Sequence, residues 1–394
     1  GEYEVICCGS KLDALKPQQP DDSHTLKISE IENDFYAEFN HEMTKEHFIS
    51  FIAYTAFDRV LTIRLYPEQD SSVRFPKMHG GKFLYYCNKH GLFEYKPKRE
   101  RKKRPENAGT NLTALMSAFA RAYHFENSAC PVFGDNAARK LFSDDEYGKI
   151  EKYISAGSGD VKTYVNTYLA PTPLARARFC EDTLNTAMKT GTAQYVILGS
   201  GLDTFSLRCG KNNIDIFEID KEDVIADKKM RINRAGVEIP DNVHMICADL
   251  SSISLSADLP KLLEENGFDK NKKTLFSCLG LLYYLTKEEI SNLFKALSEF
   301  AADGSTAVFD FADNHLFSSD VPRAKEMVKL AAESGEPMKS CFGYNELEML
   351  LQNHSFLIYE FLSDKDIQSR YFSENGEMAA FEHINYAAAV LKDK

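Results

Sequence analysis

The sequence predicts a multidomain protein with two fold classes: an all-β, antiparallel domain at the N-terminus and, behind it, an α/β domain with a doubly wound, Rossmann-like parallel sheet. Three observations carry this prediction. Strand-like segments fill residues 1–95, a block of charged residues and prolines covers residues 96–107, and from residue 108 short apolar strands alternate with helical segments. We therefore expect domains at 1–95 and 108–394, joined by a linker at 96–107.

The N-terminal strands are predicted from composition and period. Residues 48–54 are β-branched and aromatic, residues 59–66 alternate polar and apolar side chains, and residues 82–86 form a further short segment of the same kind. Alternation with period two is typical of a half-buried strand. Because no long helical period appears before residue 105, an antiparallel β module is favoured.

Seven of the ten residues from 96 to 105 are basic and two are proline. A block of this kind repels itself and cannot be buried, which indicates an extended linker. Contact with an anion or a nucleic acid is the alternative. The linker is favoured because no aromatic side chains are interleaved with the charges.

The remainder alternates between helices and strands in the way that parallel sheets require. Helical segments are expected at 112–123 and 135–142, and Thr286 with Glu289 forms a capping box that opens another helix. Short apolar strands are expected between and after these helices, at residues 195–198, 214–220, 243–248, 274–278 and 307–311.

Charge and composition exclude several classes of protein. The formal net charge of -12 disfavours nucleic acid and anionic membranes as partners. No apolar stretch approaches the roughly 20 residues of a membrane helix, and no export signal is visible. The nine cysteines are odd in number and scattered. We expect a cytoplasmic protein whose thiols are free or bound to metal.

Candidate metal ligands gather in the N-terminal domain. Five residues separate His41 from His47, Cys87 precedes His90 by three positions, and His24 lies upstream. Imidazole binds iron, zinc and copper, and a thiolate adds electron donation. Four imidazoles and a thiolate exceed the needs of a closed tetrahedral zinc site and suit an iron with one open position. Each residue alone is better explained as a surface histidine or a buried cysteine; the whole set is not.

Residues 3–95 resemble desulfoferrodoxin and the superoxide reductases. The matching segments are Val5-Ile6-Cys7-Cys8-Gly9, His24, His41-x-Met43-Thr44-x-x-His47 and Tyr86-Cys87-Asn88-x-His90-Gly91-Leu92. The resemblance implies an immunoglobulin-like β-sandwich with a non-haem iron and an open position for superoxide. It also implies an axial sulfur from Cys87 and equatorial imidazoles from His24, His41, His47 and His90.

Two departures from that family stand out. Asp22-Ser23 precede His24 where the family has Glu-Lys, so the lysine that attracts superoxide is missing. The Cys7-Cys8 pair resembles half of a four-cysteine iron knuckle whose other half is absent. Since two thiolates cannot close a tetrahedral site, no metal is assigned to that pair.

A second candidate site follows the strand at 195–198, which runs into Gly199-Ser200-Gly201. Asp220 lies 19 residues past Gly201 at the end of the next predicted strand, where a carboxylate can accept both hydroxyls of a ribose. Thr204 stands where a dinucleotide fingerprint needs a third glycine. A nucleoside cofactor without phosphates fits better, which favours S-adenosyl-L-methionine, with Asp249 and Leu250 at the adenine edge.

Further stretches extend this pattern over residues 108–392: Thr113-Ala114-Leu115, Arg121-Ala122, Arg176-x-Arg178-Phe179-x-x-Asp182, Val196 to Thr204, Phe217 to Asp220, Asp249-Leu250 and Gly280-Leu281-Leu282-x-Tyr284-Leu285. In these stretches the chain resembles the leucine carboxyl methyltransferase family, a branch of class I methyltransferases. The resemblance implies that Arg176 pairs with the methionyl carboxylate, Gly199 packs beside it, Asp220 holds the ribose, and Asp249 and Leu250 border the adenine. Leu279 replaces the family's glutamate.

Three hypotheses remain open. The first is an S-adenosyl-L-methionine-dependent O-methyltransferase fused to an iron-containing superoxide reductase-like module. In the second, the iron module is a sensor or docking domain that turns over no superoxide; in the third, both sites bind and neither turns over. The methyl acceptor is a carboxylate or hydroxyl of a small molecule or a protein. A carboxylate needs no general base, and no catalytic residue is assigned, although Tyr283, Tyr284 and His315 are candidates.

Overall fold

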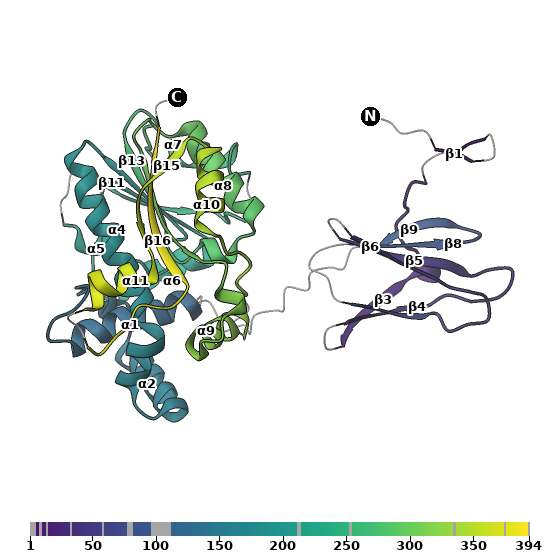
Figure 1. Cartoon of the computed structure of the whole chain (residues 1–394), viewed down its shortest axis with the longest axis horizontal. Helices are drawn as coiled ribbons and strands as arrows, with labels where there is room; N and C mark the ends of the chain where they lie inside the picture. The colour runs from purple at the N-terminus through teal and green to yellow at the C-terminus, as the bar shows by residue number, and fades with distance from the viewer. Residues whose placement is uncertain are drawn as a thin grey trace. The chain divides into compact units, whose positions relative to one another are not determined.

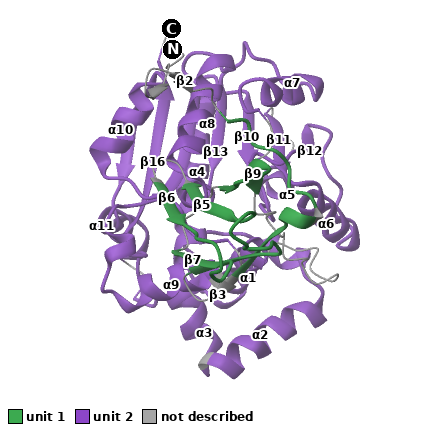
Figure 2. Ribbon diagram, turned by 90° about the vertical axis from the view of Figure 1, so that its right-hand side faces the viewer, with its two compact units in different colours: residues 1–105 green, residues 106–394 purple. Residues whose placement is uncertain are grey.

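The computed structural model describes residues 5–7, 10–12, 15–31, 34–56, 59–76, 82–95, 112–210, 214–251, 254–333, 336–373 and 376–392. The chain divides into two compact units, residues 1–105 (unit 1) and 106–394 (unit 2), shown in different colours in Figure 2. The predicted linker at 96–107 lies outside the described residues, as does Cys8.

Unit 1 is all-β, and its strands pair antiparallel. One sheet has the order β3-β4-β7 and the other β6-β5-β8-β9, with a separate β1-β2 hairpin (Figure 1). The predicted fold class is confirmed. The strands are β1 (Val5–Cys7), β2 (Ser10–Leu12), β3 (Leu26–Ile31), β4 (Asp34–Phe39), β5 (Ile49–Ala56), β6 (Arg59–Arg64), β7 (Ser72–Pro76), β8 (Lys82–Cys87) and β9 (Gly91–Tyr95).

The two sheets of unit 1 bury their facing sides in one aromatic core. Phe35 of β4 packs against Tyr54 of β5 with ring centroids 5.6 Å apart, and Tyr54 stacks on Phe83 of β8 at 4.4 Å. Side chains alternate along β8, so Phe83, Tyr85 and Cys87 all point inward and are fully buried. The same alternation that builds the core therefore places the Cys87 thiol inside the sandwich.

Unit 2 is built on a seven-stranded sheet with the order β12-β11-β10-β13-β14-β16-β15. β16 runs antiparallel to both of its neighbours, β14 and β15, so the sheet is mixed where the sequence predicted a parallel one. Its small residues, Ala387 to Ala389, are fully buried between β14 and β15. The strands are β10 (Gln194–Leu198), β11 (Asp215–Asp220), β12 (Val243–Cys247), β13 (Thr274–Cys278), β14 (Thr306–Ala312), β15 (Phe356–Leu362) and β16 (Ile384–Leu391).

Helices cover both faces of this sheet, which confirms the doubly wound prediction (Figure 1). Alternate residues of one strand enter opposite cores: Tyr195 and Ile197 of β10 pack into one cluster, Val196 and Leu198 into the other. The longer helices are α1 (Leu112–Asn127), α2 (Asp144–Ser158), α4 (Pro171–Lys189), α6 (Glu222–Arg234), α7 (Asp258–Glu265), α8 (Lys287–Phe300), α9 (Pro322–Glu333) and α10 (Tyr344–Gln352).

Short helical turns complete unit 2: η2 (Ala138–Leu141), α3 (Val161–Tyr164), η3 (Val165–Leu169), α5 (Phe205–Arg208), η4 (Leu282–Tyr284), η5 (Leu316–Ser318), α11 (Asp364–Ile367) and η6 (Gln368–Phe372). The capping box of Thr286 and Glu289 is present at the start of α8. The helix predicted at 135–142 is only the turn η2: the Asp135 carboxylate accepts the backbone N–H groups of Ala137 and Ala138 ahead of it, and the backbone is already extended at Phe142. Among the described residues, we find no helix long and apolar enough to span a bilayer.

Candidate metal centre and cofactor site

Four donor atoms converge at one end of unit 1. They come from His24, His47, Cys87 and His90 and lie within 4.8 Å of one another. The Nδ1 atom of His90 is central: it is 3.0 Å from His24 Nε2, 3.1 Å from His47 Nε2 and 3.5 Å from Cys87 Sγ. The structure thus brings together four of the five ligands that the sequence suggested.

Local backbone structure positions these donors. His24 ends the turn η1 (Asp22–His24), whose N-terminal cap is the Asp21 carboxylate. Cys87 ends β8, and the turn to β9 carries His90 and closes at Gly91, whose φ of +90° favours glycine. The amide side chain of Asn88 joins this turn to the loop of His47, because it accepts from Phe48 N and donates to the Glu46 carbonyl.

Hydrogen bonds at Nδ1 fix the orientation of three imidazoles. His24 Nδ1 is 2.6 Å from the Asp21 carboxylate, while Glu42 contacts His47 Nδ1 through its carboxylate and His41 Nδ1 through its carbonyl oxygen. The hydrogen bond from His24 lowers the pKa of Asp21 to about 2, and the bond from His47 lowers the pKa of Glu42. Contacts of this type leave the Nε2 lone pairs free for a metal.

His41 is the fifth predicted ligand, and it lies beside the four converging donors. Its ring centroid is 4.9 Å from that of His24 and 4.4 Å from that of His47. Within the described residues, its Nε2 atom is buried and has no hydrogen-bond partner. Since an orphaned imidazole nitrogen next to four converging donors is costly without a ligand, this cluster fits a metal ion.

The glycine loop of unit 2 lies at the carboxyl end of β10. Gly199 and Gly201 both have positive φ, at +71° and +48°. Gly201 N donates to one oxygen of the Asp220 carboxylate at 2.7 Å, and Lys221 N donates to the other at 2.8 Å. Burial raises the pKa of Asp220. Two backbone donors therefore fix this carboxylate at the edge of the sheet, facing the loop.

A buried polar network supports the loop from below. Thr204 is almost fully buried, and its hydroxyl donates to the Asp135 carboxylate at 2.7 Å. Arg121 bridges Asp135 and the carbonyl oxygen of Leu202, at 2.8 and 2.7 Å. Thr204 is thus a structural partner of Asp135 and not simply a missing glycine. In the loop itself, the Ser200 hydroxyl is buried and has no partner among the described residues.

Arg176 belongs to a cluster that sequence reasoning only half identified. Its Nη1 atom donates to Asp310 at 3.0 Å and to the Tyr283 hydroxyl at 2.9 Å, while Tyr283 donates to Asp310 at 2.5 Å. Gly280 N donates to the other oxygen of Asp310 at 2.6 Å. Asp310 was missed, although an acidic residue inside an otherwise apolar strand is a signal in itself.

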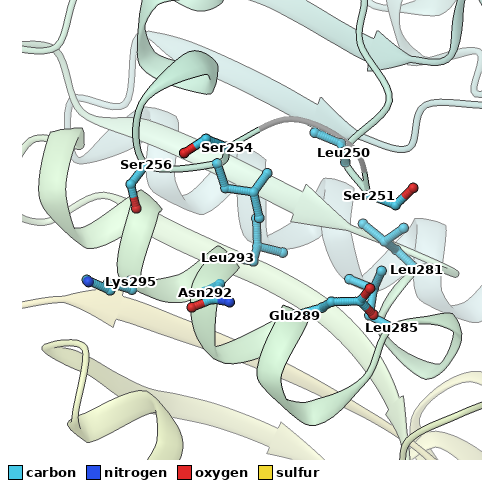
Figure 3. Close-up of a pocket in the computed structure, with 11 residues that line it drawn as sticks. Leu250, Ser251, Ser254, Ser256, Leu281, Leu285, Glu289, Asn292, Leu293 and Lys295 are labelled. Carbon is cyan, nitrogen blue, oxygen red and sulfur yellow. The ribbon is translucent and has the colours of Figure 1, made fainter. Parts of the chain in front are cut away.

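A pocket of about 370 Å³ is lined by leucines and by polar and charged side chains (Figure 3). Leu250, which follows β12, lines it together with Leu281, whose side chain would be 3.5 Å from a Cβ placed on Gly199. Asp249 lies beside the pocket, and its carboxylate accepts from Ser251. The remaining lining residues described are Ser251, Ser254, Leu255, Ser256, Leu285, Glu289, Asn292, Leu293 and Lys295.

A family model and a known protein sequence match this chain. The family model described as leucine carboxyl methyltransferase matches residues 114–298. YktD of Bacillus subtilis, a candidate S-adenosyl-L-methionine-dependent methyltransferase, is 41% identical over 304 residues, which cover 72% of this chain and 98% of YktD.

Two solved structures are also similar. The superoxide reductase of Treponema pallidum is 19% identical, covering 24% of this chain and 80% of its own, with a TM-score of 0.22. A candidate methyltransferase of Thermobifida fusca is 13% identical, covering 73% and 97%, with a TM-score of 0.45.

Proposed function

Because the chain belongs to the leucine carboxyl methyltransferase family of S-adenosyl-L-methionine-dependent methyltransferases, we propose that unit 2 methylates an acceptor oxygen at the carboxyl edge of its sheet. The observation that carries this proposal is the Asp220 carboxylate, which two backbone N–H groups hold against the glycine loop. Each of its oxygens keeps a lone pair that can accept one ribose hydroxyl.

The other cofactor contacts are assigned by position. Arg176 takes the methionyl carboxylate, the unpartnered Ser200 hydroxyl and the close backbone at Gly199 and Gly201 face the cofactor, and Leu250 encloses the adenine with Asp249 at its edge. When bound, S-adenosyl-L-methionine supplies a methyl group already activated on a sulfonium. The protein's contribution is then to hold the acceptor in line and to exclude water.

Neither of the tyrosines near Arg176, Tyr283 and Tyr284, is suited to act as the general base that an acceptor hydroxyl would need. Burial raises the pKa of Tyr283 well above its ordinary value, and burial raises the pKa of Tyr284 to about 12. Both phenols therefore keep their protons at neutral pH and cannot deprotonate an acceptor hydroxyl. A carboxylate of a small molecule or a protein is already ionised and needs no base.

The test is cofactor binding by calorimetry with Asp220→Ala. We expect the affinity for S-adenosyl-L-methionine to fall at least tenfold, because the variant loses the acceptor for both ribose hydroxyls. Asp215→Ala is the matched control: Asp215 begins the same strand, is partly exposed and pairs with Lys272 at 3.6 Å. Unchanged binding by Asp220→Ala would contradict the assignment.

For unit 1 we propose a mononuclear non-haem iron site held by His24, His41, His47, His90 and Cys87. The support is the set of converging donors and the partnerless Nε2 of His41. When bound, iron supplies one-electron chemistry for which superoxide is the candidate substrate. The chain itself contributes an electron-donating thiolate and imidazoles whose orientation Asp21 and Glu42 fix.

A sensor or docking module without turnover is the second candidate function. It is favoured by two exposed carboxylates beside the cluster, Asp21 and Glu42, which contact the imidazoles of His24 and His47 and add negative charge there. Ser23 stands where superoxide reductases have the attracting lysine. An anionic substrate therefore meets a less favourable field here.

Metal analysis and absorbance of the purified chain test the iron site. We expect bound iron and a thiolate-to-ferric absorption band that Cys87→Ser removes. The control substitution His315→Ala, at an exposed position, should leave both the iron and the band intact. Catalytic peroxide formation with bleaching of the band by superoxide supports the reductase; bleaching without turnover, or none, supports the sensor. Absence of iron after reconstitution with ferrous salt would contradict the site.

A further inference from the structure

Asp310 is a fully buried carboxylate in β14, a strand in which every residue is buried. An ionised carboxylate in such a place is stable only if charged and hydrogen-bonding partners surround it. Among the described residues, Gly280 N donates to Oδ1, and Arg176 and Tyr283 donate to Oδ2. Two donors therefore occupy Oδ2, and the fully buried carboxylate is turned towards Arg176 and Tyr283 and not towards solvent.

The same contacts fix the plane of the Arg176 guanidinium. Among the described residues, its hydrogen bonds all leave from Nη1, which reaches Asp310 and Tyr283. The guanidinium also approaches Gly280 closely: a Cβ on that residue would be 2.6 Å from Nη1, 2.7 Å from Nη2 and 2.9 Å from Cζ. The group is thus held through Nη1 and by the close backbone of Gly280, while Nε and Nη2, which make no hydrogen bond among the described residues, remain as donors for a second anion.

We infer that Asp310 is a positioning residue for cofactor binding, acting through Arg176 on the methionyl carboxylate. This inference rests on the proposed function of unit 2. A flexible arginine loses less entropy on binding a carboxylate when its plane is already fixed, and its charge is tolerated in a buried site because Asp310 neutralises it. Asp310 itself does not contact the cofactor.

The affinities for two ligands distinguish this positioning role from a general structural role. S-adenosyl-L-homocysteine carries the amino-acid carboxylate, whereas 5′-methylthioadenosine has the same adenosine and a thioether but no carboxylate. Asp310→Asn keeps the size of the side chain and removes its charge. We expect this variant of the full chain to bind S-adenosyl-L-homocysteine at least tenfold more weakly by calorimetry, and to bind 5′-methylthioadenosine as the wild type does.

Further variants make the test decisive. In an Arg176→Ala background, Asp310→Asn should cause no further loss of S-adenosyl-L-homocysteine affinity, because its effect passes through Arg176. Tyr283→Phe keeps the Asp310–Arg176 pair and should cause a smaller loss, again confined to the ligand with the carboxylate. It provides the same comparison if Asp310→Asn does not fold, as judged by circular dichroism.

Equal losses for both ligands would overturn the inference, because a merely structural role affects the whole site. Unchanged S-adenosyl-L-homocysteine affinity would also overturn it. Asp220→Ala provides the distinction from the proposed function, since it should weaken both ligands alike. If the wild type bound neither ligand, the proposed function would fail and the inference with it.

Discussion

Position 280 has room for a hydrogen atom but not for a methyl group. A Cβ there would meet three atoms of the Arg176 guanidinium at 2.6 to 2.9 Å, so Gly280→Ala must push Arg176 away from its fixed plane. We expect the affinity for S-adenosyl-L-homocysteine to fall by a factor of ten or more, measured by calorimetry.

The matched control is Gly210→Ala. Gly210 has nearly the same backbone conformation, with φ of +64° against +68°, but a Cβ there would meet nothing within 4 Å. Both changes carry the strain of a left-handed alanine, about 1 kcal/mol, and only Gly280→Ala displaces Arg176. Equal effects of the two substitutions on cofactor affinity would contradict the steric explanation.

The roles of single residues could be predicted where the sequence contains a recognisable pattern. The spacing of His41 and His47 and the Cys87–His90 pair indicated a metal site, and the structure brings His47, Cys87 and His90 together with His24. Glu42 was not predictable, because nothing in the sequence says which oxygen reaches an imidazole Nδ1. Such contacts depend on the path of the backbone in a loop, and the hydrophobic period of the sequence does not determine that path.

At the scale of elements, one buried ion pair joins helix α6 to strand β11. Lys228 Nζ lies 2.6 Å from Glu218, both side chains are inaccessible to solvent, and Ser206 also donates to Glu218 at 2.7 Å. Lys228→Met leaves an unpaired buried carboxylate. We expect it to lower the free energy of unfolding by about 3–5 kcal/mol, measured by urea denaturation.

Two variants check this explanation. Lys228→Met combined with Glu218→Met should be more stable than Lys228→Met alone, because no uncompensated charge remains. Lys149→Met breaks an exposed pair with Asp145, in which both side chains are about three-quarters exposed, and should leave the free energy of unfolding nearly unchanged. A large loss of stability in Lys149→Met, or no loss in Lys228→Met, would contradict the explanation that burial makes an unpaired charge costly.

Helix α1 carries a pH-dependent contribution through His124. Burial lowers the pKa of His124 to about 4 from 6.5, and its Nε2 accepts from Val132 N at 3.0 Å. As pH falls, His124 therefore takes up a proton in the unfolded chain at a higher pH than in the folded chain. The contribution is fully present above pH 6.5 and is lost as pH falls towards 4, by about 3 kcal/mol in all.

His124→Gln removes this titration and keeps a hydrogen-bond acceptor. We expect the wild type to lose about 3 kcal/mol of stability relative to the variant between pH 7 and pH 4. Urea denaturation at each pH measures this change. His315→Gln, at an exposed position, should track the wild type throughout. A pH-independent difference for His124→Gln would rule out the buried neutral imidazole.

Helices and strands could be predicted where the hydrophobic period is strong. They were less predictable where tertiary contacts determine the structure. The strand at 195–198 and the capped helix after Thr286 appear as expected. The direction of β16 was not predictable, because a buried strand has the same apolar sequence whether it runs parallel or antiparallel. Residues 135–142 form only a short turn, and the buried contacts of Asp135 with Thr204 and Arg121 join segments far apart in the chain, which a local pattern does not reveal.

At the scale of the whole molecule, the division into two fold classes followed from composition, since period two and helical alternation occupy different parts of the chain. The structure adds that each unit has hydrophobic clusters of its own: among the described residues, one cluster lies in unit 1 and two lie in unit 2. Separate cores are expected to unfold as separate cooperative transitions.

Ligands should therefore shift the two transitions independently in calorimetric scans. A ligand that binds only the folded state at 100 times its dissociation constant stabilises by about 2.7 kcal/mol. Ferrous iron, added anaerobically, should raise the unit 1 transition alone, and S-adenosyl-L-homocysteine should raise the unit 2 transition alone. His90→Ala should abolish the first shift and Asp220→Ala the second, each leaving the other intact. A single transition that both ligands raise would mean that the two sites share one cooperative unit, and separate cores could not then explain the architecture.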